Sequence, residues 1–233
     1  MLPVRGGEFK MGDRHGMYIP SSILFPKINC VPVKIDDFHI SSKLITNADW
    51  YAVMRNEIRS DKLANIPVTN VSWNDVQMFI EKLNGLLQCE FHLPTEAQWE
   101  YAARGGDLDV DHIFAGGNIL NQYGWYDENS GFRLHDVATK RPNLLGLFDM
   151  CGNVWEWCQD WSRDWYRSPY PKTGAFGLFN GEPTINPQGP LTGVKKIIRG
   201  GSYKSSAKEC WVFYRAKRNP TSRKKNIGFR LAY

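Results

Sequence analysis

A segment rich in tryptophan, glycine and acidic residues, Gly146 to Trp161, carries the residue types most able to do chemistry. It holds three tryptophans, two glycines and three acids in sixteen residues. The alternation of Val154, Trp155, Glu156 and Trp157 is typical of a β-strand with both indoles on one face and the glutamate on the other. A carboxylate buried in such a strand needs a cation or strong hydrogen bonds.

The acids of this segment suggest a site for a hard cation. Asp149 and Glu156 offer carboxylate oxygens, and the carbonyls between them can help to complete the oxygen shell that Ca²⁺ requires. The alternative is that these acids only cap a turn. The residues by themselves favour neither interpretation.

The same segment also carries a family resemblance. Residues 146–157, G-L-F-D-M-C-G-N-V-W-E-W, resemble the signature of the formylglycine-generating enzyme (sulfatase-modifying factor) family. Other family-like runs follow in the expected order at residues 6–12, 67–73, 93–105, 199–203 and 226–231. The resemblance implies one irregular α+β domain over residues 1–233, with short helices around a small twisted sheet, and a fold like that of C-type lectins.

The resemblance also implies a structural calcium ion. The ligands at the matching positions are the side chains of Asp149 and Glu156 and the carbonyls of Gly152 and Val154.

Family members that convert a peptidyl cysteine of sulfatases to formylglycine hold copper(I) with two cysteines that are separated by four residues. The matching positions here are Ser205 and Cys210. Soft thiolates suit copper(I), and a hydroxyl cannot replace one of them. Cys210 is therefore either a remaining oxidase thiol or a small buried hydrophobe. Ser202, a candidate catalytic residue beside Cys210, and Arg215 resemble positions near the family's substrate groove, and their alternative role is structural.

The residues after the Gly-Gly-Ser-Tyr turn suggest a different class of function. Variable proteins of diversity-generating retroelements share this fold and display changeable residues between that turn and the closing Ile-Gly-Phe-Arg. Aromatic and basic residues alternate in the same window here, as in a recognition surface. The candidate ligand-binding residues are Tyr203, Ser205, Lys208, Trp211, Phe213, Tyr214 and Lys217. We expect a non-oxidase module that binds a peptide or protein. The alternative is a copper-dependent oxidase that uses Cys210.

Charge is distributed unevenly along the chain. From Lys195 onward there are twelve Lys and Arg against the single Glu209, whereas the preceding residues carry a net charge of −6. A basic end favours an acidic partner, and nucleic acid is the less favoured candidate. The alternative is that internal carboxylates pair with many of these arginines.

Cysteine usage and hydropathy give expectations about the compartment. Five cysteines without CxxC spacing indicate neither a disulfide framework nor a zinc site. Cys30 and Cys89 are expected to be buried thiols, and a reducing compartment disfavours a disulfide between Cys151 and Cys158. No apolar run reaches membrane-spanning length, and the first residues lack a signal-peptide pattern. The chain as written is expected to be cytoplasmic, or secreted if the native start lies upstream.

The remaining patterns predict the elements that position these residues. A hydroxyl followed three residues later by an acid or amide predicts helix starts at Thr46, Ser72 and Thr95. Asn84-Gly85 is expected to end the second helix. Strands are expected at residues 8–11, 31–40, 195–199 and 229–233, with interruptions at Pro32 and Asp36-Asp37. The Pro/Gly/Tyr-rich stretch from Trp161 to Gly193 is expected to help to line a groove.

Overall fold

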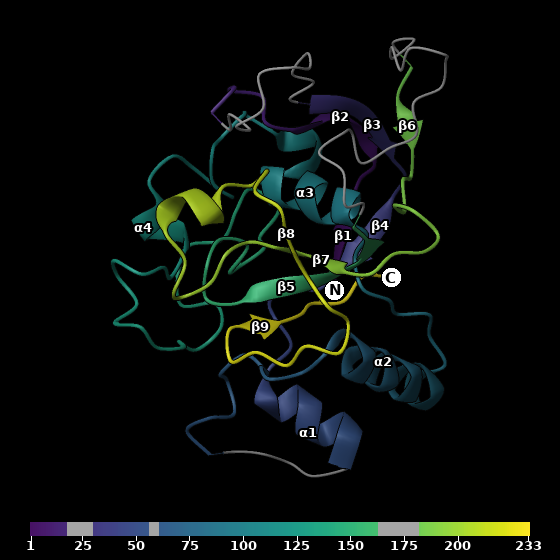
Figure 1. Ribbon diagram of the computed structural model, residues 1–233, viewed down its shortest axis with the longest axis vertical. Coiled ribbons are helices and arrows are strands. Elements are labelled where there is room, and N and C mark those ends of the chain that lie inside the picture. Colours follow the sequence, from purple (N-terminus) through teal and green to yellow (C-terminus); the bar gives the residue numbers. More distant parts are fainter. Residues whose placement is uncertain (18–29, 56–60, 163–181) are drawn as a thin grey trace.

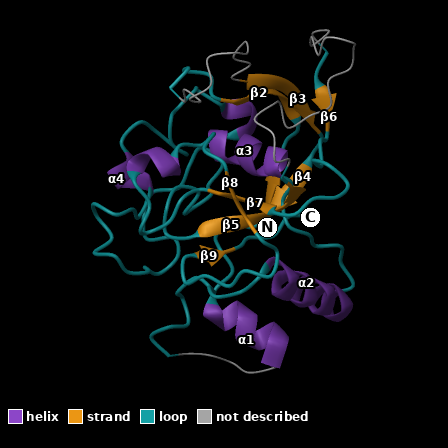
Figure 2. Cartoon of the chain, in the orientation of Figure 1, coloured by secondary structure: helices purple, strands orange, loops and turns teal. Residues whose placement is uncertain are grey.

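The computed structural model describes residues 1–17, 30–55, 61–162 and 182–233 (Figure 1). The expected groove-lining stretch falls largely outside these residues. In the described part the chain is mixed α+β, with short helices and small sheets joined by long irregular segments (Figure 2). None of its helices combines the length and the apolar character that a membrane crossing requires.

The helices begin where the hydroxyl-and-acid pattern predicts. Helix α1 (Asn47–Arg55) follows Thr46, whose backbone N–H donates to Asp49 and whose hydroxyl accepts from the Asp49 backbone. Ser72 forms a full capping box at α2 (Trp73–Leu87), and Thr95 does so at α3 (Glu96–Arg104). Such boxes satisfy N–H groups that have no partner inside the helix, so a local signal sets these boundaries. Three short elements follow later in the chain: η1 (Gly106–Leu108), α4 (Leu120–Tyr123) and η2 (Ala207–Cys210).

The central sheet contains the tryptophan-rich segment. Strand β5 (Trp155–Trp161) lies between β7 (Lys196–Arg199) and β9 (Ile227–Gly228), and β8 (Ala216–Arg218) pairs with the other side of β7. In Figure 1, α3 lies on one side of β5, and α1 and α2 lie on the other. Both faces of β5 are therefore covered, which explains why five of its seven residues are buried and the other two are half-buried.

Two smaller sheets come mainly from the N-terminal region. Strand β1 (Leu2–Val4) pairs antiparallel with β4 (Phe38–Ile40), and β2 (Gly7–Gly12) pairs antiparallel with β3 (Cys30–Ile35). The two-residue β6 (Thr184–Ile185) adds to β3 in parallel. As predicted, the residues between β3 and β4 are Asp36 and Asp37.

Four expectations about these elements are corrected. Helix α2 continues to Leu87, because the Asn84 side chain bonds the backbone of Phe91 instead of ending the helix. Pro32 lies inside β3 rather than interrupting it. The last sheet strand is β9, and Ala232 joins only isolated bridges. Finally, Cys30 and Cys89 are only half-buried, whereas the other three cysteines are buried.

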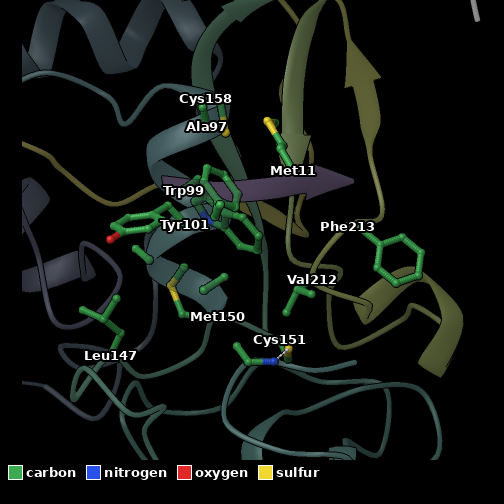
Figure 3. Packing of buried hydrophobic residues seen from close by; sticks show 14 of the residues in the cluster. Met11, Ala97, Trp99, Tyr101, Leu147, Met150, Cys151, Cys158, Val212 and Phe213 are labelled. Carbon is green, nitrogen blue, oxygen red and sulfur yellow. Dashed lines mark hydrogen bonds between the residues drawn. The ribbon is translucent and has the colours of Figure 1, made fainter. Parts of the chain in front are cut away.

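The largest cluster of buried apolar residues joins α3 to the segments that carry the candidate site (Figure 3). Trp99 and Tyr101 of α3 belong to this cluster, together with Met150 and Cys151 of the Gly146–Trp161 segment. Phe213, a predicted ligand-binding residue, is also a member. This packing fixes the backbone from which the C-terminal residues extend.

Candidate functional site

Glu156 has a cationic partner, as its burial requires. Arg230 donates two hydrogen bonds to its carboxylate, at 2.6 and 3.0 Å, and neither residue is exposed. Arg230 also donates from Nη1 to the Ser41 carbonyl and from Nη2 to the Phe148 carbonyl, so all three of its side-chain nitrogens have a partner. The expectation that a buried glutamate needs a cation is confirmed, and an arginine fills that role.

The other carboxylate of the predicted calcium site lies in a tight turn. Asp149 accepts hydrogen bonds from the backbone of Ala138 and the side chain of Asn153, and burial raises its pKa to about 6. Both Glu156 oxygens are directed to Arg230, so this arrangement does not fit a calcium ligand set. The described residues contain no group of three or more His, Cys, Asp or Glu that is arranged to hold a metal ion. Neither observation tests the carbonyls of Gly152 and Val154, and calcium ligation by Asp149, Gly152, Val154 and Glu156 stays a prediction.

A second buried ion network lies between α3 and the central sheet. Arg199 of β7 forms ion pairs with Glu96 and Glu100 of α3 and donates to the Tyr214 carbonyl at 2.5 Å. Arg104 donates to Glu100 at 2.8 Å, and these two cations lower the Glu100 pKa even though burial acts to raise it. Sequence reasoning missed this network, because its partners are far apart in the chain.

Glu96 connects this network to the surface. It accepts two hydrogen bonds of 2.6 Å from Arg215, whose side chain is partly exposed. Its own backbone N–H donates to Asp160, and burial raises the pKa of Asp160 to about 7, with a contribution from the Glu96 charge. Arg215 therefore has a structural role, as one of the two interpretations predicted.

The Gly-Gly-Ser-Tyr turn rests directly on the Gly146–Trp161 segment. Gly200 and Gly201 have φ values of +94° and +77°, which favour glycine. The Gly200 carbonyl accepts from the Gly152 N–H at 2.7 Å, and the Tyr203 N–H donates to the Asn153 carbonyl at 2.9 Å. The two motifs singled out in the sequence thus form one rigid unit.

Ser202 and Ser205 lie side by side beneath this turn. Their hydroxyl oxygens are 3.3 Å apart, both residues are buried, and Asn226 donates to Ser202 at 3.2 Å. Ser202, predicted as a candidate catalytic residue, is therefore a hydrogen-bonded part of the turn.

Cys210 is fully buried, and burial raises the pKa of its thiol well above the usual value. Cys151 donates from its Sγ to the Cys210 carbonyl at 3.2 Å, and burial raises its pKa to about 12. The family's copper position thus holds one hydroxyl and one thiol that resists ionisation. This donor set does not fit copper(I), which takes thiolates.

The predicted ligand-binding residues differ in their exposure. Tyr203, Ser205 and Phe213 are buried. Lys208 is exposed, and Trp211, Tyr214 and Lys217 are half-buried. Phe213 packs into the main core, and Ser205 is enclosed by the turn, so neither side chain is available at the surface. Tyr203 is also buried, so the accessible set consists of Lys208, Trp211, Tyr214 and Lys217, together with the exposed Lys204.

The basic C-terminal segment is partly neutralised within the fold. Arg199, Arg215, Arg223 and Arg230 each pair with a carboxylate. Lys196 is buried between the rings of Trp73 and Trp161, with its Nζ 4.0 and 3.8 Å from their centroids. Internal pairing of the arginines, one of the two interpretations of this charge, is confirmed for these four.

Comparison with known proteins agrees with this geometry. The description "sulfatase-modifying factor enzyme 1-like domain" matches residues 1–233. The chain belongs to this family. It is 30% identical to a formylglycine-generating enzyme of Streptomyces coelicolor, over 97% of this chain and 87% of that protein. It is 33% identical to the formylglycine-generating enzyme of Bos taurus, over 71% of this chain but only 43% of the bovine protein.

The comparison with solved structures finds a relative that is named as a variable protein and not as an enzyme. "Treponema denticola variable protein 1" superposes with a TM-score of 0.80 at 29% identity, and the match covers all of this chain and 94% of that one. The family, the α+β fold and the resemblance to a variable protein are thus shown. The sequence relatives carry the name of an enzyme, whereas this structural relative carries the name of a variable protein. Ser205 and Cys210 stand where the family's copper site is expected, so they are relevant to whether this chain acts as the enzyme or as a variable protein does.

Proposed function

We propose that this member of the family is a non-oxidase binding module that recognises a peptide or protein through its C-terminal segment. The observation that carries the proposal is the pair Ser205 and Cys210. A hydroxyl stands where the first copper thiol is expected, and it is buried and 3.3 Å from the Ser202 hydroxyl. The remaining thiol is buried and resists ionisation. These residues favour recognition over oxygen activation.

The way in which the segment is held supports a role in display. Residues 203–225, here called the recognition segment, are anchored at their start by the Tyr203–Asn153 bond and by Ser130, which donates to the Tyr203 carbonyl at 2.6 Å. Near the other end, the Lys224 carbonyl accepts from Asn70 at 3.0 Å. A rigid base lowers the entropy cost of presenting exposed side chains to a partner.

The exposed residues of the recognition segment supply cations and one accessible indole. Lys204 lies over the Tyr203 ring, with its Nζ 5.3 Å from the centroid, and Lys208 lies over the Trp211 ring at 5.6 Å. Aromatic anchors such as the Trp211 indole are among the residue types that dominate binding energy at protein interfaces. The neighbouring lysines add positive charge that favours an acidic partner. The similarity to a protein named as a variable protein supports the same conclusion.

Selection from a displayed peptide library tests this proposal. Peptides enriched on the wild-type protein are expected to lose at least about tenfold in affinity for Trp211→Ala and for Lys204→Glu, because each change removes an anchor. Lys10→Glu, at an exposed position of β2, has the same charge change as Lys204→Glu and should leave binding intact. If no peptide is enriched, or if the enriched peptides bind all variants equally, the proposal fails.

A second candidate, the copper-dependent oxidase, is favoured by the match to the Streptomyces enzyme over 97% of this chain. Cys151 contacts Cys210 through the 3.2 Å bond to its carbonyl and could supply a second thiol. Anaerobic titration with copper(I), followed by thiolate-to-copper absorption, distinguishes the candidates. Tight one-to-one binding that is lost in both Cys210→Ser and Cys151→Ser would support the oxidase.

A further inference from the structure

A polar pocket on the opposite side of β3 from β2 has no role in the proposed function. Its volume is about 450 Å³, which lies within the range of small-molecule sites. It lies where the β3–β4 turn, the start of α3, the end of β5 and the residues after β6 meet. The lining residues are Ile35, Asp36, Asp37, His92, Thr95, Gln98, Gln159, Asn186 and Gln188.

The backbone and side chains of this pocket are held by their own hydrogen bonds. Asn186 donates to the Asp36 carboxylate at 2.6 Å and accepts from the Asp36 N–H at 2.9 Å. Asp37 accepts from the Gly6 N–H at 2.7 Å, and Gln98 accepts from the Thr95 N–H at 2.9 Å. A site fixed in this way loses little conformational entropy when it binds a ligand.

The lining of the pocket is rich in hydrogen-bond acceptors. Two carboxylates lie in the β3–β4 turn, and the buried Oε1 of Gln159 receives no hydrogen bond from the described residues. His92 contacts the Leu93 carbonyl through Nδ1 at 2.8 Å, so the neutral ring donates there and leaves Nε2 as an acceptor. These groups favour a ligand rich in N–H and O–H donors.

The start of α3 lies at this pocket, but it does not make the pocket favour an anion over a ligand rich in N–H and O–H donors. Helix α3 directs backbone N–H groups towards its start, but Asp160 accepts from Glu96 and the Thr95 hydroxyl accepts from Gln98. The two lining carboxylates disfavour an anion, and the four amides of Gln98, Gln159, Asn186 and Gln188 suit hydroxyl groups, which both donate and accept.

We propose that this pocket binds a small hydroxylated primary amine, such as an amino sugar, with its ammonium group at Asp36 and Asp37. The hydroxyl groups contact the side-chain amides. The pocket is separate from the recognition segment, so the proposal does not depend on the proposed function.

Calorimetric titration of the full chain at low ionic strength tests the pocket, with D-glucosamine, D-glucose and D-gluconate as the probes. At a pH where the amine is protonated, glucosamine is expected to bind about fivefold more tightly than glucose, the factor that corresponds to about 1 kcal/mol for one exposed ion pair. Gluconate is expected not to bind. Absence of glucosamine binding, or equal binding of gluconate, overturns the proposal.

The decisive variant removes the two carboxylate charges of the pocket while it keeps the shape of both side chains. Asp36→Asn with Asp37→Asn keeps an oxygen for the Asn186 and Gly6 donors, so the fold should persist, and an unchanged melting temperature verifies this. The variant is expected to bind glucosamine and glucose equally. Asp107→Asn with Asp136→Asn changes the net charge by the same amount at two exposed acids outside this pocket and should keep the fivefold preference. If the variant with Asp36→Asn and Asp37→Asn still prefers glucosamine to glucose, the assignment of the ammonium site is refuted.

Discussion

Arg230 forms a bidentate ion pair with Glu156, a residue 74 positions earlier in the chain, with bonds of 2.6 and 3.0 Å. Both side chains are inaccessible to solvent. The pair joins the central strand β5 to the last residues of the chain, and through the Phe148 carbonyl it also holds the Gly146–Trp161 segment. The conformation of this segment therefore depends on a contact between distant parts of the sequence.

Replacing Glu156 by Ala should destabilise the fold strongly. The change leaves the Arg230 guanidinium buried without its counter-charge, a defect that typically costs about 3–5 kcal/mol. Chemical denaturation of the two proteins measures this difference. Arg223→Ala removes the exposed pair with Asp75 and should cost far less, because solvent screens an exposed ion pair. Equal losses for the two variants would contradict the role given to the buried pair.

A structural calcium ion predicts that a chelator lowers the melting temperature, whereas the Glu156–Arg230 pair predicts no change. Because Arg230 already occupies both Glu156 oxygens, we expect a chelator to leave the melting temperature unchanged. Differential scanning calorimetry with and without chelator measures this. A fall of several degrees, together with calorimetric Ca²⁺ binding that Asp149→Ala abolishes, would instead establish the predicted calcium ligands.

The buried Asp160 should make stability depend on pH. Burial and the Glu96 charge raise its pKa from 3.8 to about 7, so ionisation is less favourable in the folded state. Below pH 3.8 the group is neutral in both states and contributes no cost. The cost grows as the pH rises from 3.8 to about 7 and is complete above that.

The Asp160→Asn variant isolates this contribution. Its free energy of unfolding relative to the wild type should increase between pH 4 and 7, because asparagine keeps an acceptor oxygen for the Glu96 N–H without becoming charged. Denaturation at several pH values gives the comparison. Asp136→Asn, at an exposed acid, is the matched control for the loss of one negative charge. A constant difference for Asp160→Asn would mean that the carboxyl ionises normally.

Restoring the missing cysteine should create a copper site. Ser205→Cys places a second thiol at the position that the family resemblance assigns to the copper pair with Cys210. Anaerobic titration is expected to show thiolate-to-copper absorption at one equivalent in this variant and none in the wild type. Ser206→Cys, one residue away and exposed, serves as the matched control. Equal copper binding by the wild type and Ser205→Cys would instead support the copper-dependent oxidase as the function of this chain.

Features set by neighbouring residues could be predicted from the sequence. The helix starts at Thr46, Ser72 and Thr95 depend on a hydroxyl and an acid or amide three residues apart, so a short window contains the whole interaction. The alternation that predicts the strand at Trp155–Trp161 and the glycines that predict the turn at Gly200-Gly201 are also signals within a few residues. The motifs also identified the family and, with it, the α+β fold.

Only the tertiary structure decided which partners these residues meet. The sequence showed that a buried Glu156 needs a cation, but the choice of Arg230 depends on how distant strands come together. Asn84 resembled a helix stop until Phe91 supplied backbone partners for its amide. Phe213 resembled a displayed aromatic, yet it packs into the core. The physical reason is that burial and ion pairing depend on contacts between segments, whereas capping and turns depend on the chain within a few residues.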